Sequence, residues 1–107
     1  MRRFAHVIRM IAEYLPEYQR LHANAWPEVL AMIRACNIQN NSIYHKDGFL
    51  FDYFEYTGDD YQADMARMAS DSHNQSWWEL TMPMQAPLES RSPGEGWASM
   101  EEVFRLI

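Results

Sequence analysis

An Asp-Gly pair between two strand-like runs restricts the fold of this chain more than any other feature of its sequence. Asp47-Gly48 separates two strand-like runs, residues 38–45 and residues 49–56, and the second run is rich in aromatic side chains. Asp-Gly favours a two-residue loop whose twist matches that of two antiparallel strands. We therefore expect a tight β-hairpin at this point of the chain.

The two-residue loop also sets which side chains of the hairpin share a face. It places Ile43 opposite Asp52 and Asn41 opposite Phe54. Because side chains alternate along a strand, Asn41 and Asp52 should lie on one face among apolar neighbours. Asp52 should therefore lie at an edge or have a polar partner. The residues expected on this face are Asn41, Ile43, His45, Leu50, Asp52 and Phe54.

Strand-like and helix-like segments alternate along the rest of the chain. Helical spacing predicts a long helix after Pro16, which Pro27 should kink or split. This β-α-β-β-α-β order predicts one α+β domain over 1–107, with a ferredoxin-like protomer and a four-stranded antiparallel sheet. The predicted elements are a strand over 4–11, a helix ending near 36, the hairpin, helices up to 82, a loop over 83–99 and a closing strand over 102–107.

The strand over 49–56 is apolar on both of its faces. In a ferredoxin-like layout the helices cover only one face of the sheet. Monomers seldom expose a large apolar patch, so the open face should pack on a second copy of the chain. We expect a homodimer in which the two sheets meet.

Charge and cysteine content exclude several classes of function. Acidic residues outnumber basic ones by 15 to 9 and the basic residues form no cluster, which argues against binding to nucleic acid or to an anionic membrane. The single cysteine, Cys36, cannot form an intrachain disulfide or a thiolate zinc site. The histidines lack metal-ligand spacing. With no apolar run of about 20 residues and no signal-peptide pattern, we expect a cytoplasmic protein.

A phenol, an imidazole and an indole follow one another along the first predicted helix. Tyr18, His22 and Trp26 are spaced by four residues, although the neighbouring Pro27 leaves the direction of Trp26 open. Together they combine a proton donor, an acid–base group that titrates near neutral pH and an apolar platform. The alternative is an aromatic stripe in the core with a hydrogen-bonded histidine.

The adjacent pair Trp77-Trp78 is a second candidate site feature. Neighbouring helical residues point about a quarter-turn apart, so one indole should pack in the core while the other borders a cavity. An indole face at a cavity can stack on the C–H face of a sugar. Two tryptophans at a protein interface are the alternative.

Several of these motifs together resemble one known family. Residues 17–28 contain the pattern E-Y-x-x-x-H-x-x-x-W-P-E, and the likeness continues through residues 40–44, the Trp77-Trp78 pair and residues 102–104. The chain resembles the L-rhamnose mutarotase family over most of its length. This resemblance implies a dimeric α+β barrel that interconverts the α and β anomers of a 6-deoxy sugar without a metal or cofactor.

The resemblance also implies roles for individual residues. It makes His22 the proton donor and makes Tyr18 and the Trp77-Trp78 pair sugar-binding residues, with Trp26 beside them. Histidine suits the reaction because its ordinary pKa, about 6.5, lets it both give and take protons near neutral pH.

Two positions depart from the rhamnose enzymes, which carry Tyr in place of Asn41 and a small apolar residue in place of Asp52. Both changes fall on one predicted face, so we expect Asn41 and Asp52 to contact the sugar, and L-fucose becomes an alternative to L-rhamnose. Two further alternatives are a non-catalytic module that binds a sugar or another small ligand, and a cofactorless oxygenase of similar fold.

Overall fold

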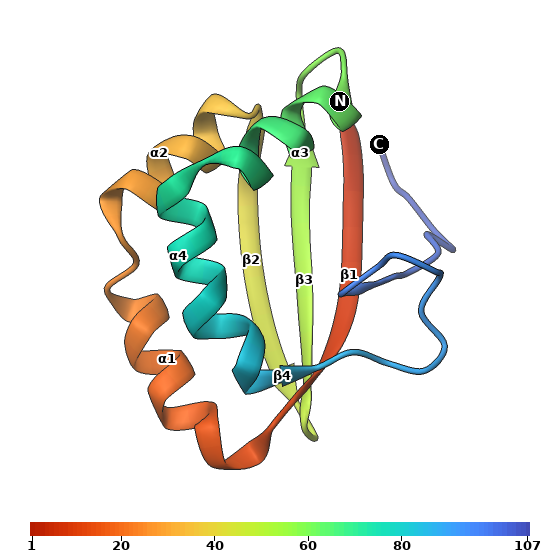
Figure 1. Ribbon diagram of the computed structural model, residues 1–107. Helices are drawn as coiled ribbons and strands as arrows, with labels where there is room; N and C mark the ends of the chain where they lie inside the picture. Colours follow the sequence, from red (N-terminus) through yellow and green to blue (C-terminus); the bar gives the residue numbers. More distant parts are fainter.

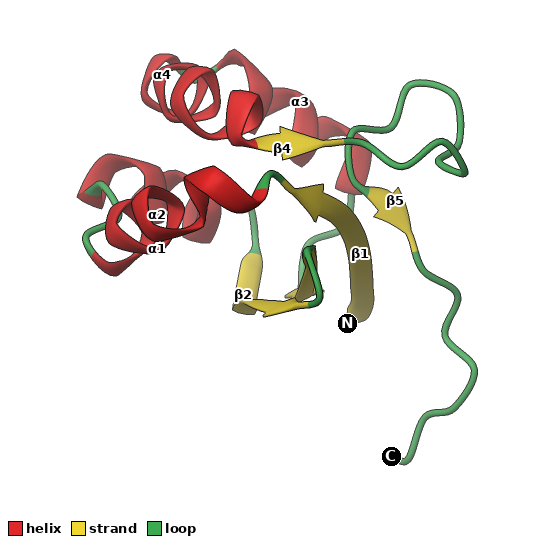
Figure 2. Cartoon of the chain, turned by 90° about the horizontal axis from the view of Figure 1, so that it is seen from below, coloured by secondary structure: helices red, strands yellow, loops and turns green.

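Four helices lie along one face of a curled antiparallel sheet in the computed structural model, which describes residues 1–107 (Figures 1 and 2). The long strands are ordered β2-β3-β1, and two short strands, β4 and β5, pair with the other edge of β1 and fill the fourth position. The predicted α+β fold with a four-stranded antiparallel sheet is confirmed. The strands are β1 (Arg2–Met10), β2 (Ile38–Lys46), β3 (Phe49–Tyr56), β4 (Gln85–Ala86) and β5 (Ala98–Ser99). The helices are α1 (Leu15–Ala23), α2 (Pro27–Ala35), α3 (Tyr61–Ser70) and α4 (Ser72–Thr81), with 3-10 turns at Ala12–Tyr14 and Met82–Met84.

The β2–β3 hairpin has the turn and register that the sequence predicts. Asp47 and Gly48 both have positive φ, 53° and 81°, as a type I′ turn requires. Ile43 lies opposite Asp52, as expected. The predicted pair of Asn41 with Phe54 is wrong, however, because the register shifts before Ser42.

A β-bulge causes this shift. Gln39 pairs with Glu55 and Ser42 with Tyr53, so Asn40 and Asn41 together oppose a single residue of β3. Asn40 takes the left-handed conformation, with φ of 50°. The Asn41 side chain then donates a hydrogen bond from Nδ2 to the Tyr53 carbonyl oxygen at 3.1 Å. The bulge thus ties Asn41 to β3 through its side chain.

Pro27 splits the first helical stretch, as predicted. Helix α1 ends at Ala23, and Trp26 is extended, with φ −64° and ψ 131°, immediately before Pro27 begins α2. A proline at the first helical position loses no hydrogen bond that the helix needs. The break divides the stretch into two short helices, with α2 lying beyond the upper end of α1 in Figure 1.

The end of the chain differs from the prediction. Residues 102–107 form no strand; the chain follows the edge of β1 only as far as Met100, whose N–H donates to the Ala5 carbonyl at 2.9 Å. Beyond it, Val103 is 88% and Phe104 78% exposed. Figure 2 shows this tail running past the sheet on the side away from the helices, where a single copy offers no strand for it to pair with.

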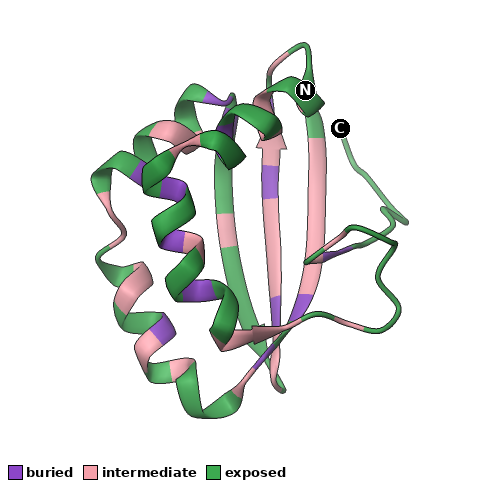
Figure 3. Ribbon diagram, viewed as in Figure 1, coloured by how far each residue is buried: buried purple, intermediate pink, exposed green.

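Apolar side chains on the helix-facing side of the sheet form two core clusters. Along β3, Leu50 belongs to one cluster and Phe54 to the other, with Asp52 between them on the same face. Figure 3 shows that most of β2 remains exposed at the sheet edge. No helix of the chain is both long and apolar enough to cross a bilayer. The clusters comprise Cys36, Ile38, Phe54, Tyr56 and Met68, and Ile8, Met10, Tyr18 and Leu50.

Candidate active site

Tyr18 and His22 stack on each other at successive turns of α1. Their ring centroids are 4.1 Å apart and the ring planes differ by 25°. His22 Nδ1 lies 2.8 Å from the Tyr18 carbonyl oxygen. Because a carbonyl only accepts hydrogen bonds, Nδ1 carries the proton and donates it. The other ring nitrogen, Nε2, therefore remains available to a ligand.

Helix α4 adds Trp77 to this pair. The indole meets the His22 ring edge-on, with centroids 5.1 Å apart, and it is itself buried. Trp26 packs edge-on against Trp77 at 5.2 Å and lines neither cavity beside His22. Trp26 therefore supports Trp77 from behind rather than facing the space next to the imidazole.

Two cavities meet at a wall formed by Tyr18, His22, Ile43 and Trp77. One, of about 450 Å³, lies between α1, α2 and the edge strand β2. The other, of about 380 Å³, lies between α4 and the segment after it. Both volumes suit a small ligand. The first is also lined by Asn41, Ser42, Tyr44 and His45, and the second by Trp78, Thr81, Gln85, Gly96 and Trp97.

Trp78 serves both of the roles considered for the tryptophan pair. It packs against the core cluster around Phe54 and also lines the second cavity. Trp77 is more deeply buried yet borders both cavities. The expected division into one core indole and one cavity indole is therefore replaced by two indoles that each do both.

The segment predicted as a loop over 83–99 forms a wall of the second cavity through Gln85, Gly96 and Trp97. Gln85 Nε2 donates a hydrogen bond to the Tyr18 hydroxyl oxygen at 3.0 Å. The phenol's own proton is therefore free for a ligand. Sequence analysis missed Gln85 because an isolated amide before a proline-rich stretch gives no motif.

Burial sets the protonation states of the stacked pair. Desolvation lowers the pKa of His22 below its ordinary value, although the hydrogen bond to the Tyr18 carbonyl opposes this shift. Desolvation also raises the pKa of Tyr18 to about 12, with the Gln85 hydrogen bond opposing and the charge of Asp52 adding to the shift. At neutral pH the imidazole is therefore mainly uncharged and the phenol is protonated.

The structure places the two predicted specificity residues differently. Asn41 lines the cavity between α1, α2 and β2. Asp52 faces the helices one strand further in, lines neither cavity, and has a polar partner in His6 at 2.9 Å. Sequence analysis missed His6, and its signal was a lone histidine among Phe4, Ile8 and Met10 on one face of β1.

A larger open cavity, of about 540 Å³, lies at the end of α2 beside the β2 bulge. It shares Leu30, Ile33 and Asn41 with the His22 cavity. Its other lining residues include Arg34, Asn37 and Thr57, and none of these is suited to proton transfer near neutral pH. No group of three or more His, Cys, Asp or Glu side chains is arranged to hold a metal ion.

Comparisons with known proteins agree on one family. A family model described as L-rhamnose mutarotase matches residues 3–106. An L-rhamnose mutarotase from Oceanobacillus iheyensis is 27% identical over 108 residues, which cover 99% of each chain.

Two solved structures share the fold. The L-rhamnose mutarotase from Formosa agariphila superposes with a TM-score of 0.78 at 20% identity over the whole of both chains. The tetracenomycin F2 cyclase from Streptomyces glaucescens, a type-II polyketide cyclase, superposes with a TM-score of 0.69 at 14% identity. The cyclase shows that this fold hosts more than one chemistry, whereas the family model spans nearly every residue of the present sequence. The chain belongs to the L-rhamnose mutarotase family.

Proposed function

We propose that this protein interconverts the α and β anomers of a 6-deoxy-L-hexose, either L-rhamnose or L-fucose. Membership of the family supports the reaction type, and the relative from Oceanobacillus iheyensis is named an L-rhamnose mutarotase. The observation that carries the proposal is the half-buried His22, whose Nδ1 is held by the Tyr18 carbonyl at the wall shared by two cavities.

The reaction needs one proton to move between two oxygens on the same sugar carbon. In the proposed mechanism, His22 Nε2 accepts the proton of the anomeric hydroxyl and returns it to the ring oxygen, which opens the pyranose to the aldehyde. After the aldehyde rotates, the same nitrogen takes the proton from the O5 hydroxyl and gives it to the new anomeric oxygen. His22 is thus acceptor and donor in turn, which reconciles its uncharged resting state with a role as proton donor.

Tyr18 and the tryptophans orient the sugar in this proposal. The Tyr18 hydroxyl accepts from Gln85, so its proton can be donated to a sugar oxygen next to His22. The indoles of Trp77 and Trp78 offer apolar faces to the C–H groups of the ring and to the C6 methyl group.

Exchange NMR on the anomeric protons tests the proposed activity. The protein should accelerate α/β exchange of L-rhamnose or L-fucose and leave D-glucose and D-galactose at their spontaneous rates. A non-catalytic sugar-binding module would shift the sugar signals without faster exchange, and an oxygenase would consume dioxygen with its own substrate. Either of those results would contradict the mutarotase assignment.

The pH dependence should report the uncharged state of His22. Because burial lowers the pKa of His22 below about 6.5, the imidazole accepts a proton at pH 7 and loses this ability as the pH falls through that value. We expect kcat/KM to be flat near neutral pH and to fall on an acid limb with its midpoint below about 6.5. Rates measured from pH 4.5 to 8 and corrected for spontaneous exchange check this. A rate that rises steadily on acidification would mean that only the charged imidazole acts.

We also propose that the protein is a homodimer whose open sheet faces meet. Phe49 and Phe51 lie on the side of β3 opposite to the core residue Leu50, and no helix covers them. The exposed C-terminal tail, with Val103 and Phe104, extends on that same side (Figure 2). A second copy is the simplest cover for both apolar surfaces.

Sedimentation checks the dimer. At micromolar concentration the protein should sediment at twice 12.7 kDa, and Phe51→Glu should shift it towards the monomer by placing a charge on the open face. Leu80→Glu, the same kind of change at a 42% exposed position of α4, should leave the dimer intact. A wild-type protein that stays monomeric and folded at this concentration would refute the proposal.

A further inference from the structure

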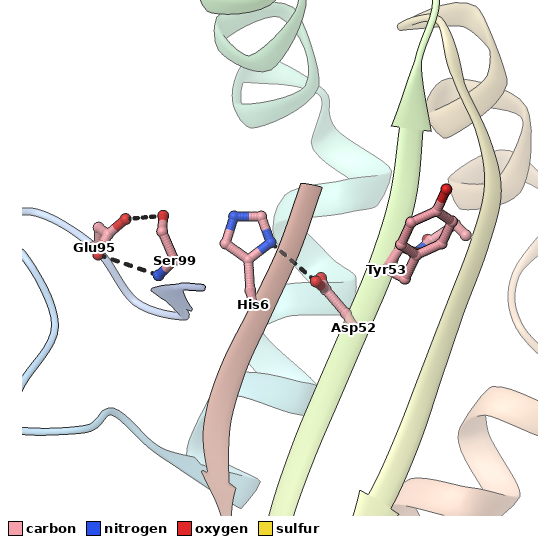
Figure 4. A network of polar contacts seen from close by, with 6 residues as sticks. His6, Asp52, Tyr53, Glu95 and Ser99 are labelled. Carbon is pink, nitrogen blue, oxygen red and sulfur yellow. Dashed lines mark hydrogen bonds and ion pairs between the residues drawn. The ribbon is translucent and has the colours of Figure 1, made fainter. Parts of the chain in front are cut away.

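His6 and Asp52 form a hydrogen-bonded pair in the middle of the helix-facing side of the sheet. They lie directly opposite each other on β1 and β3, and His6 Nδ1 is 2.9 Å from Asp52 Oδ1. The two side chains are 15% and 17% exposed. Figure 4 shows the His6 ring between Asp52 on one side and Ser99 with Glu95 on the other.

The His6 ring is fixed by its neighbours. It stacks on Phe54 with centroids 5.7 Å apart and lies parallel to Phe4 at 6.2 Å. On its far side, the Glu95 carboxylate accepts hydrogen bonds from the hydroxyl and N–H of Ser99. These bonds and one from the Ser92 N–H lower the pKa of Glu95 more than the nearby His6 does. A ring held in this way presents Nδ1 to Asp52 in one orientation.

Asp52 uses only part of its hydrogen-bonding capacity within the protein. Its Oδ1 meets His6, whereas Oδ2 contacts no donor of the chain. A carboxylate has about four acceptor positions, and Oδ2 is not among the fully buried unpaired atoms, so a small molecule can reach it. The free oxygen is therefore suited to the hydroxyl groups of a ligand.

The pair belongs to a cross-strand row that runs from Ile43 on β2 through Asp52 and His6 to Ser99 on β5, and both ends of this row lie near the candidate site. Across the sheet, Ile43 is opposite Asp52, and Ile43 lines both cavities beside His22. At the other end of the row, Gly96 and Trp97 line the second cavity close to Ser99. The charge of Asp52 also contributes to the raised pKa of Tyr18. The pair thus lies next to residues of the site, although neither His6 nor Asp52 lines either cavity.

Stability alone gives no reason for a pair of polar side chains at this position. Leu50 and Phe54 flank Asp52 on β3 and belong to the two core clusters. A mostly buried polar pair that contains a carboxylate stabilises a fold no more than well-packed apolar residues of similar volume do. A role in ligand recognition accounts for both the location of the pair and the unused carboxylate oxygen.

We propose that His6 is a positioning residue that holds the Asp52 carboxylate towards the sugar, so that the two residues act as one unit in selecting the hydroxyl pattern. This inference rests on the proposed sugar-binding site. His6 does not contact the sugar; its Nδ1–H fixes which Asp52 oxygen remains free for it. A ring that lacks this donor should leave Asp52 present but wrongly oriented.

Two substitutions separate the donor from the ring. His6→Phe keeps an aromatic ring in the stack with Phe4 and Phe54 but removes Nδ1. His6→Asn loses the ring but keeps an amide N–H near the position of Nδ1. Dissociation constants of L-rhamnose and L-fucose, measured by NMR titration on the full-length protein, should rise about tenfold or more in His6→Phe for the sugar that the wild type prefers. The dissociation constant of the other sugar should change by less than about threefold, and His6→Asn should restore most of the wild-type preference between the two sugars.

The double variant with Asp52→Ala decides whether the two residues act together. Once Asp52 is absent, His6→Phe should weaken binding by no more than about twofold further. Four results would each overturn the inference. The first two are equal weakening of the binding of both sugars and additive effects in the double variant. The others are unchanged affinities in His6→Phe and a wild type that binds neither sugar. A thermal melt of each variant confirms that the affinities refer to folded protein.

These experiments distinguish a failure of the positioning role from a failure of the mutarotase proposal. If the wild type binds one sugar selectively through His6 and Asp52 but does not accelerate anomer exchange, the mutarotase proposal fails and the positioning role stands. If exchange is accelerated but His6→Phe leaves both dissociation constants unchanged, the positioning role fails and the mutarotase proposal stands.

Discussion

Replacing His22 by alanine should remove most of the acceleration of anomer exchange while leaving the protein folded. A positioned acid–base group contributes about 10²- to 10⁴-fold to a proton-transfer reaction. Neither the Tyr18 phenol, whose pKa is about 12, nor the surrounding indoles can replace it as a proton acceptor at pH 7. Exchange NMR over a range of protein concentrations measures the loss directly.

The folded state should tolerate this change because His22 is only partly buried and its hydrogen bond to Tyr18 lies within a single helix. Alanine is also the best helix-forming residue. The lost stack with Tyr18 and the edge contact with Trp77 should cost about 1–3 kcal/mol. His73→Ala, at an exposed position early in α4, is the matched control and should keep wild-type exchange rates. Normal exchange in folded His22→Ala protein would remove His22 from the mechanism.

Local signals account for the parts of the fold that the sequence predicts well. Asp47-Gly48 determines a turn type and a loop length, and these fix the register next to the turn. Pro27 lacks an N–H, so the helical stretch has to restart there. The four-residue spacing of Tyr18 and His22 brings the two rings together on α1 without help from the rest of the chain.

The errors arise where a segment depends on distant partners. Residues 102–107 have the composition of a strand, but composition does not say whether an edge is free to receive one, and β4 and β5 occupy the free edge of β1. The bulge at Asn40 inserts an extra residue that no turn signal predicts, so the predicted Asn41–Phe54 pair fails directly beside the correct pair of Ser42 with Tyr53. His6 becomes a candidate only when β1 pairs with β3 and brings it opposite Asp52.

The bulge bears on substrate choice because it determines where Asn41 points. After the shift, Asn41 lines the cavity beside His22 while one N–H of its Nδ2 donates to the Tyr53 carbonyl, which leaves Oδ1 as a free acceptor and the second N–H as a free donor. Asp52 lies on the next strand, opposite Ile43, and its Oδ2 has no donor within the chain, although the residue lines neither cavity. The two departures from the rhamnose enzymes thus add acceptors where those enzymes carry a phenol and an apolar group.

Restoring the rhamnose-type residues should therefore change the sugar preference. L-rhamnose and L-fucose differ in the orientation of their ring hydroxyls, so discrimination requires hydrogen-bond partners at defined positions. A buried polar group left unpaired by the wrong isomer costs about 1–3 kcal/mol. Asn41→Tyr combined with Asp52→Ala should shift the ratio of kcat/KM for L-fucose to that for L-rhamnose towards L-rhamnose by about tenfold or more.

The single variants and one control make this shift interpretable. Asn41→Tyr alone should move the ratio in the same direction. Asp52→Ala should lower kcat/KM for L-fucose more than kcat/KM for L-rhamnose. In both variants the reason is the loss of an acceptor that fits one hydroxyl pattern. Asn24→Tyr makes the same chemical change at an exposed position after α1, outside both cavities, and should leave the ratio unchanged. If the double variant folds and keeps the wild-type ratio, Asn41 and Asp52 do not determine the sugar preference. Discrimination between the two sugars must then come from the unchanged site residues, Tyr18, Trp77 and Trp78.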